Sequence, residues 1–339
     1  MSITFALPSK GAIAEPTLGF LKECGLRVEK PNDRQYTGNM PLLPEISVLF
    51  QRVKDVFYKV ADGTAQIGIT GYDVVQEYYN ENVIVVHNGL GYGHCQLTVA
   101  VPETWVDVNS MADLLDVAAD FREYQQRNIR VATTYTALTR QYLHQQGIHH
   151  FTLVKAEGAI EAAPTIGYAD IVVDLTQTGT TLRENHLKML ADGVIVESQA
   201  CLIANRKALK SNPEIMGTLR VLLEYIDAAL NGKRYQQMSV NILGTDAESI
   251  AHKVAAHPAT RGLQGPTIAP IYSANGHDAQ HHGAQWYTVT IIVQTKDLLH
   301  AVEYLRSIGA SQMSTIPLRY AFLDNAPTFT RLVKQLETM

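Results

Sequence analysis

The sequence is poor in cysteine and has no cluster of basic residues, and these two absences narrow the possible functions. Its three cysteines among 339 residues, Cys24, Cys95 and Cys201, are scattered and lack the spacing of a metal site. We therefore expect free thiols in a reducing compartment rather than a disulfide-stabilised secreted fold. A net charge of −5 without any basic run predicts no nucleic-acid partner.

Long apolar runs are missing as well. No stretch approaches the roughly 20 apolar residues of a membrane-spanning helix, and the strand-like opening, Ile3–Leu7, does not resemble a secretion signal. We therefore expect no membrane partner and a cytoplasmic location. Hydrophobic residues make up 46% of the chain and charged residues 18%, which is typical of a folded protein with two or three domains.

Short apolar segments alternate with helical patterns over the first two thirds of the chain. This alternation predicts parallel sheets with helices on both faces, and binding sites at the carboxyl ends of the strands. The expected strands are 3–7, 46–50, 67–70, 97–102, 129–133, 151–155, 171–175 and an interrupted segment at 194–203, with helices at 15–24, 57–61 and 136–146.

The pattern changes after Asn212. A long helix is expected at 215–230, and Asn231-Gly232-Lys233 reads as a hinge. The later segments follow a strand–helix–strand–helix–strand order with a short additional strand, which predicts a ferredoxin-like α+β domain with a regulatory or assembling role. These segments are 238–243, 248–256, 267–272, 286–293, 297–308 and 313–317.

The most informative motif is Ala169–Asn185, ADIVVDLTQTGTTLREN. A buried strand at 171–175 is followed by a turn at Gly179, and Thr180 or Thr181 is expected to cap the next helix. Backbone N–H groups and threonine hydroxyls gathered at such a turn form a good phosphate site, and Asp174 could face a sugar hydroxyl or a metal. An ordinary strand-to-helix turn is the alternative.

Several other loops allow two interpretations. Lys10, in Pro-Ser-Lys-Gly after the first strand, suits an anion or is a solvated lysine. Arg52 and Asp55 could bind phosphate and a hydroxyl, or form a surface ion pair. Thr70 and Gly71 end a strand, where the backbone could approach a ligand closely or simply turn.

Two further residues lie near these loops. Glu161, in EGAIEAAP, precedes the threonine motif and is either a site carboxylate or an exposed helix residue. Cys95 follows a glycine-rich turn and is expected to pack rather than act as a nucleophile, because His94 is the only neighbouring base.

Taken together and in this order, the motifs resemble those of the ATP phosphoribosyltransferase family, in its long, self-regulated form. That enzyme catalyses the first step of histidine biosynthesis. The resemblance covers nearly the whole chain and rests on ALPSKG, EPTL, FQRVKD, VADGTAQIGITGYD, LGYGHCQLTVAVP, RVATTYTALTRQYL, EGAIEAAPTIGYADIVVDLTQTGTTLRENHL, SQACLIAN, GLQGPTIAPIY and YLRSIGASQM.

The resemblance implies two α/β lobes of the periplasmic-binding-protein type II fold with the active site between them, and a ferredoxin-like regulatory domain. The first lobe would comprise residues 1–98 and 194–230, the second 99–193, and the regulatory domain 231–339.

The implied reaction joins N1 of ATP to C1 of 5-phosphoribosyl diphosphate (PRPP) and releases pyrophosphate, with Mg²⁺ held mainly by PRPP and by no protein side chain. Glu161 and Asp174 would be the catalytic residues. Binding of PRPP would involve Asp174, Thr176, Gln177, Thr178, Gly179, Thr180 and Thr181. Contacts with ATP or the diphosphate would come from Lys10, Gly11, Arg52, Thr70, Gly71 and Asp73.

The family's long form also implies inhibition by L-histidine and a homo-oligomer, from dimer to hexamer. The inhibitor would bind at Leu263, Gly265, Pro266 and Thr267. The nearby segment 273–285 contains His277, His281 and His282, and its small polar composition favours a mobile surface loop over a metal site.

Two positions depart from the family pattern. Ala12 and Gln96 stand where basic residues are common, so ATP binding could shift onto Lys10 and Arg52. The alternative function is accordingly a catalytically silent paralogue that binds a nucleotide or an amino acid.

Overall fold

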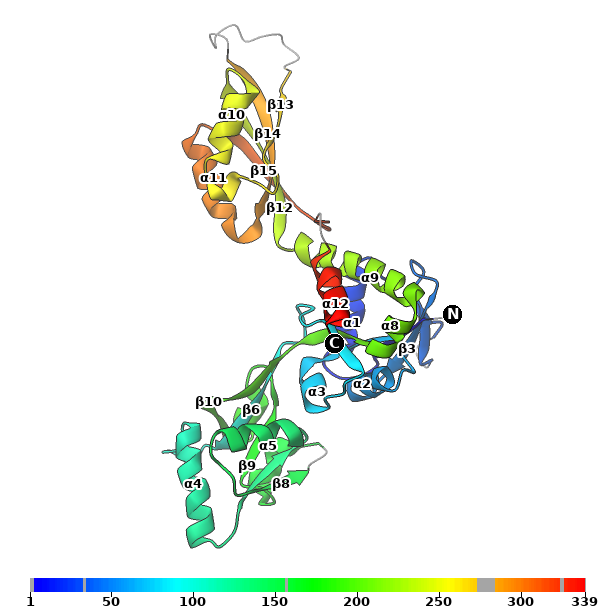
Figure 1. Ribbon diagram of the computed structural model, residues 1–339. Helices are drawn as coiled ribbons and strands as arrows, with labels where there is room; N and C mark the ends of the chain where they lie inside the picture. Colours follow the sequence, from blue (N-terminus) through cyan, green and yellow to red (C-terminus); the bar gives the residue numbers. More distant parts are fainter. Residues whose placement is uncertain (1–2, 33–34, 156–157, 273–283, 324–325, 339) are drawn as a thin grey trace. The chain divides into compact units, whose positions relative to one another are not determined.

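The computed structural model describes residues 3–32, 35–155, 158–272, 284–323 and 326–338 (Figure 1). Internal contacts divide the chain into a larger unit, Met1–Leu219 with Arg331–Met339, and a smaller unit, Arg220–Thr330. The described residues form three sheets, of six, five and four strands. Within the same ranges no helix has both the length and the apolar character needed to cross a membrane. His277, His281 and His282 lie outside the described residues.

The six-stranded sheet, with its flanking helices, forms what we call the first lobe of the larger unit. Its order is β2-β3-β1-β4-β11-β5, in which β1, β3 and β4 are parallel and β11 is antiparallel to both of its neighbours. Apolar side chains such as Phe5, Val48 and Ile69 are fully buried in it. The elements are β1 (Ile3–Pro8), α1 (Ala14–Glu23), β2 (Thr37–Asn39), β3 (Ile46–Gln51), α2 (Val53–Ala61), β4 (Ile67–Gly71), α3 (Tyr72–Glu77), β5 (Val83–His87), β11 (Ala200–Asn205) and α8 (Arg206–Ser211).

Helix α2 packs closely on β4. A side chain at Gly68 would approach Val56 and Val60 of α2 to within 2.7 and 3.0 Å, so the close contact requires glycine. The hydroxyl of Thr70 donates to the carbonyl of Val53 at 2.8 Å. These contacts fix the start of α2 relative to the end of β4.

The five-stranded sheet, with its helices, forms the second lobe. Its order is β10-β6-β9-β7-β8, with β7 parallel to β8 and β9, and β6 antiparallel to β9 and β10. The elements are β6 (Cys95–Pro102), α4 (Met111–Tyr124), β7 (Ile129–Thr133), α5 (Thr136–Gln145), β8 (Phe151–Lys155), a 3₁₀ turn (Ile160–Ala162), α6 (Ala163–Ile166), β9 (Ile171–Thr176), α7 (Thr180–Glu184) and β10 (Leu187–Ser198).

The third sheet lies in the smaller unit and is fully antiparallel, in the order β13-β14-β12-β15. Helices α10 and α11 cover one face, where Val240, Val289 and Leu305 form a buried core (Figure 1). This order and connectivity confirm the predicted ferredoxin-like domain. The elements are β12 (Tyr235–Gly244), α10 (Ala247–Ala255), a 3₁₀ turn (Pro258–Thr260), β13 (Thr267–Pro270), β14 (Gln285–Gln294), a 3₁₀ turn (Thr295–Asp297), α11 (Leu298–Ser307) and β15 (Ser311–Pro317), preceded by α9 (Pro213–Gly232) and followed by α12 (Pro327–Glu337).

Most strands expected from the sequence are confirmed to within two residues, but some elements are new or shifted. The expected helix at 57–61 begins at Val53, before its first buried residue, Val56. The cap of α7 was wrongly placed at Thr180 or Thr181: Gly179 holds that position, with a φ of 73° that favours glycine. Elements that were not expected from the sequence include β2, β5, α3, α4 and α12.

The boundaries between the sheets also differ from those of the expected domains. The segment 194–203 is two strands, because β10 ends at Ser198 in the second lobe and β11 begins at Ala200 in the first. The whole of β6, from Cys95, lies in the second sheet. The smaller unit begins at Arg220 rather than 231, since the end of α9 packs with later chain: the Ala321 N–H donates to the Ala228 carbonyl at 2.9 Å. The three-domain division stays a prediction.

Candidate active site

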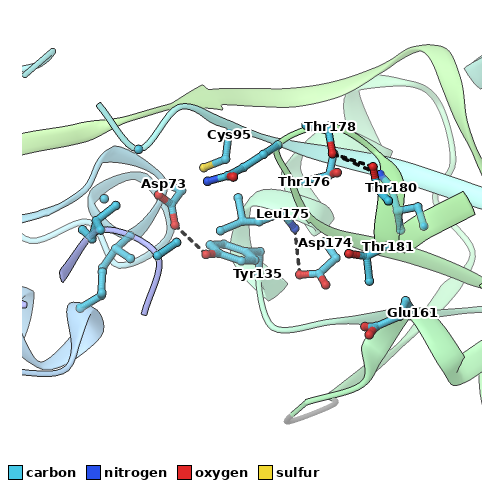
Figure 2. A pocket seen from close by; sticks show the side chains of 18 of the residues that line it. Asp73, Cys95, Tyr135, Glu161, Asp174, Leu175, Thr176, Thr178, Thr180 and Thr181 are labelled. Atoms are coloured by element: carbon cyan, nitrogen blue, oxygen red, sulfur yellow. Dashed lines mark hydrogen bonds between the residues drawn. The ribbon is translucent and has the colours of Figure 1, made fainter. Parts of the chain in front are cut away.

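A cavity of about 570 Å³ in the larger unit is lined by residues of both lobes (Figure 2). The second lobe contributes the end of β9, the following loop and the start of α7. The first lobe contributes the end of β4 and the starts of α2 and α3. Residues that the sequence proposed for the site and that line this cavity are Gly71, Asp73, Glu161, Asp174, Thr176, Gln177, Thr178, Thr180 and Thr181.

The loop between β9 and α7 presents hydroxyl groups to the cavity. The Gly179 N–H donates to the Thr176 hydroxyl at 2.8 Å, which closes the turn. The hydroxyl oxygens of Thr178 and Thr180 lie 2.9 Å apart, as Figure 2 shows, and both side chains are exposed. We call residues 176–181 the threonine loop.

Helix α7 has only five residues, so its dipole is small and anion binding here depends on the hydroxyl and N–H groups of the threonine loop. Arg183 adds a positive charge beside it, since its Nη2 donates to the Thr180 hydroxyl at 3.3 Å. Gly179 itself does not line the cavity. Its role is conformational, because its φ of 73° is uncommon for other residues.

Two carboxyl groups of the second lobe, Glu161 and Asp174, face the same cavity (Figure 2). Asp174 Oδ1 accepts the N–H of Leu175 at 2.8 Å. Burial, followed by the negative charge of Glu161, raises the pKa of Asp174 to about 6. The pair concentrates negative charge where hydroxyl donors or a cation would be stabilised.

Asp73 of the first lobe is buried, and its carboxylate is occupied by protein groups. Its Oδ2 accepts from the Tyr135 hydroxyl and its Oδ1 from the Ser198 hydroxyl, each at 2.6 Å. A side chain at Gly71 would collide with this carboxylate. Asp73 thus joins the two lobes, and the absence of a side chain at Gly71 leaves space for its carboxylate. Both residues line the cavity, and their contact with ATP or diphosphate stays a prediction.

A second carboxylate on α3 also joins the lobes. Glu77 accepts the N–H groups of Ala137 and Leu138 at 2.9 and 3.0 Å, at the start of α5 in the second lobe. Glu77 and Tyr135 were not expected at the site from the sequence. The one signal for the pair of carboxylates is their spacing of four residues, which places Asp73 and Glu77 on one side of a helix.

Burial, aided by the negative charge of Asp73, holds the pKa of the Tyr135 phenol well above its usual range. Tyr135 therefore stays neutral at physiological pH, and its hydroxyl donates a hydrogen bond to Asp73. The thiol of Cys95, which also lines the cavity, has a pKa raised to about 11 by burial and by Asp73. Cys95 is protonated at neutral pH, as a packing residue would be.

Four of the residues expected on the first-lobe wall do not line the cavity: Lys10, Gly11, Arg52 and Thr70. Lys10 and Arg52 are exposed elsewhere, and Thr70 is fully buried with its hydroxyl bound to Val53. The wall instead includes Lys54, at the start of α2, which sequence reasoning passed over. The only feature of the sequence that pointed to Lys54 as a site residue is its position between Arg52 and Asp55.

The smaller unit has a cavity of its own, of about 820 Å³. Leu263, Gly265, Pro266 and Thr267, the residues expected to bind an inhibitor, all line it. Gly265 has a φ of 106°, a conformation that side chains disfavour. Other described lining residues come from β14 and from the segment before α12, and include Thr290, Phe322 and Leu323.

Comparisons with known proteins agree with these features. A family model described as ATP phosphoribosyltransferase matches residues 52–227, and one described as the HisG C-terminal domain matches residues 233–320. The chain is 38% identical over 336 residues to a chloroplastic ATP phosphoribosyltransferase of Arabidopsis thaliana, covering 98% of this chain and 80% of the relative. It is 33% identical over 340 residues to ATP phosphoribosyltransferase of Nitrobacter winogradskyi, covering 99% of both.

Among solved structures, the chain is similar to a chain of the ATP phosphoribosyl transferase (HisG:HisZ) complex from Thermotoga maritima. The TM-score is 0.51 at 25% sequence identity, and the match covers 66% of this chain and 98% of that one.

Proposed function

Because this chain belongs to the ATP phosphoribosyltransferase family, we propose that the residues lining the cavity of its larger unit carry out that enzyme's reaction. The enzyme joins N1 of ATP to C1 of PRPP, forming phosphoribosyl-ATP and pyrophosphate. The bond from C1 to the diphosphate breaks, and its electron pair leaves with the diphosphate. The lone pair of N1 forms the new bond, so no general base is needed before attack.

The threonine loop is the proposed site for the 5-phosphate of PRPP. It is supported by the paired hydroxyls of Thr178 and Thr180, which are exposed in the cavity. Several hydroxyl and N–H donors around one point suit three phosphate oxygens. Arg183, held against Thr180, would add charge to this end of the site.

Glu161 and Asp174 are the proposed partners of the ribose. Their carboxylates would accept hydrogen bonds from ribose hydroxyls and stabilise the positive charge that develops near C1 in the transition state. This assignment is supported by the position of both residues in the cavity. Burial and the nearby Glu161 make ionisation of Asp174 more costly there than in water. A ligand that brings hydroxyl donors and positive charge would relieve this cost.

Mg²⁺ is a further part of this proposal. Carboxylate and phosphate oxygens are its preferred ligands, and the acidic pair Glu161 and Asp174 is compatible with a cation arriving on the diphosphate. When bound, the ion would neutralise charge on the leaving diphosphate. The ribose and the 5-phosphate would be positioned by Glu161, Asp174 and the threonine loop.

For the smaller unit, we propose that L-histidine binds in the 820 Å³ cavity and inhibits the enzyme. The support is the lining itself, which gathers the Gly265-Pro266-Thr267 turn with apolar side chains such as Leu263. Backbone groups of such a turn can hold the charged ends of an amino acid.

We also propose that the chain forms a homo-oligomer. Mass photometry of the purified chain would show species from dimer to hexamer.

The experiment that tests the proposed function is pyrophosphate release from ATP, PRPP and Mg²⁺, with and without L-histidine. We expect release from the wild type, suppression by L-histidine, and no suppression by D-histidine. A variant with Thr178→Val and Thr181→Val should lose PRPP affinity, because two hydroxyl donors are removed from the threonine loop. Unchanged affinity would contradict the phosphate assignment.

Thr152→Val provides the matched control, since Thr152 is exposed on β8 and lies outside the cavity. It should bind PRPP like the wild type. Release that L-histidine does not affect would leave the enzyme assignment intact and reject the inhibitor site.

A further inference from the structure

The cavity of the larger unit holds little positive charge on its first-lobe wall. Among the described residues that line the cavity, the one cationic side chain is Lys54, whereas Asp73, Glu161 and Asp174 are acidic. ATP and PRPP both carry linked phosphates, which need charge-assisted donors to bind tightly. Lys10 and Arg52, the cations first expected on this wall, lie outside the lining.

The backbone of Lys54 is held in place by the packing of α2. Lys54 is the second residue of this helix. Its neighbour Val53 receives the Thr70 hydrogen bond, and Gly68 allows α2 to lie directly on β4. A charge carried on such a fixed element can be directed at a ligand more accurately than one on a loop.

The ammonium group of Lys54 is also held by aromatic rings. Its Nζ lies 4.4 Å from the centroid of the Tyr78 ring and 5.8 Å from that of Tyr58. Both rings attract the cation through their faces. Interaction with the Tyr78 hydroxyl holds the pKa of Lys54 above its usual value, so the group is charged at neutral pH.

We propose that Lys54 binds the linked phosphates of a substrate, the diphosphate of PRPP or the triphosphate of ATP, at the first-lobe wall of the cavity. The inference rests on the proposed function, because it names a residue for that same site. Ala12 lines the cavity with only a methyl group, so the charge on this wall comes from Lys54. If the ligand is the diphosphate, Lys54 also stabilises the charge that the leaving group acquires.

The test compares the wild type with Lys54→Met, Lys54→Arg and Lys59→Met. Methionine keeps much of the apolar stem and removes the charge, whereas arginine keeps the charge. Lys59 is on the same helix but outside the cavity, 3.9 Å from Asp62, so its variant is the matched control. The measurements are KM for ATP and for PRPP, kcat, and calorimetric binding of ribose 5-phosphate, which lacks the diphosphate.

We expect Lys54→Met to raise the KM of one substrate at least about tenfold, as for loss of one hydrogen bond between charged groups. A rise for PRPP identifies the diphosphate, and a rise for ATP identifies the triphosphate. Lys54→Arg should recover most of the loss, while ribose 5-phosphate binding and the Lys59→Met variant should match the wild type.

The proposal is overturned if Lys54→Met leaves both KM values unchanged, or if Lys54→Arg is as impaired as Lys54→Met. It is also overturned if ribose 5-phosphate binding falls equally, since the loss would then not depend on linked phosphates. If Lys54→Met does not fold, Lys54→Gln replaces it. An inactive wild type that binds neither substrate would reject the proposed function itself, which separates the two failures.

Discussion

At the scale of single residues, the carboxyl group of Asp174 makes the stability of the protein depend on pH. Its pKa is about 6 in the folded protein, above the ordinary 3.8, because it is buried beside Glu161. The folded state therefore binds this proton more tightly than the unfolded chain does. As the pH rises from about 4 to 6, ionisation of Asp174 lowers the free energy of unfolding, and the loss persists at pH 7.

Replacing Asp174 by asparagine should therefore stabilise the protein and impair the enzyme. We expect the free energy of unfolding at pH 7 to rise by on the order of 1 kcal/mol, because the cost of a poorly solvated charge disappears. Pyrophosphate release should fall by about a hundredfold or more, because the proposed partner of the ribose loses its negative charge. Urea unfolding and the release assay measure the two effects.

Asp116→Asn is the control for this prediction, since Asp116 is exposed on α4 and outside the cavity. The wild-type rate should also rise with pH through about 6 as Asp174 ionises, and the Asp174→Asn variant should lack this step. A destabilised variant with full activity would show that Asp174 is an ordinary structural carboxylate.

The residues of the threonine loop were predictable because they are contiguous in sequence. The role of Asp73 in joining the lobes was not predictable, for the opposite reason. Its hydrogen-bond partners are Tyr135, 62 residues away, and Ser198, 125 residues away, so no local pattern could reveal them. Lys54 was missed because the expected helix began four residues too late, at 57 rather than Val53.

At the scale of elements, the lobes are joined through one short helix, α3, that places a carboxylate at the start of α5. Glu77 accepts two N–H groups of the first turn of α5, which otherwise lack partners within the helix. The negative charge of Glu77 also interacts favourably with the positive, N-terminal end of the α5 dipole. The contact acts as a helix cap supplied by the other lobe.

Glu77→Gln should weaken this cap, because the amide keeps one acceptor oxygen and loses the charge. We expect a loss of about 1 kcal/mol in the free energy of unfolding and faster hydrogen exchange at Ala137 and Leu138. Mass spectrometry after deuterium exchange would locate the effect. Glu81→Gln, at an exposed position just after α3, should show neither change, and protection unchanged at α5 would refute the capping role.

The sheets were more predictable than the helices. Buried strands such as β4 and β9 are nearly continuous apolar runs, which a sequence shows directly. Helix α4 buries only Met111, Leu114 and Ala118 among polar neighbours, so its apolar stripe is narrow. The Ser110 and Asp113 capping box marks its start and is visible in the sequence.

At the scale of the whole molecule, each compact unit has a ligand cavity of its own. A ligand that binds only the folded state stabilises it, by about 2.7 kcal/mol at a concentration one hundred times its Kd. Scanning calorimetry of the full chain should therefore show PRPP and L-histidine each raising an unfolding temperature. No shift with PRPP, at concentrations that support turnover, would contradict binding to the folded larger unit.

The family and the ferredoxin-like domain were predictable because their motifs recur in a fixed order along nearly the whole chain. The places where the chain passes from one sheet to another were not predictable. The interrupted segment 194–203 is extended on both sides of Gln199, and only the pairing partners show that its two parts belong to different sheets. Pairing is a property of distant segments, which a local pattern does not contain.

The strands that connect the lobes have a consequence for protein engineering. Cys95, where the chain enters the second lobe, is paired with Ser198, where it leaves. The second lobe is therefore an insertion in the first, and the two chain segments that connect the lobes lie next to each other. A chimaera that exchanges residues 95–198 with those of a relative needs only two junctions in one place, and carries the threonine loop and both Glu161 and Asp174 with it.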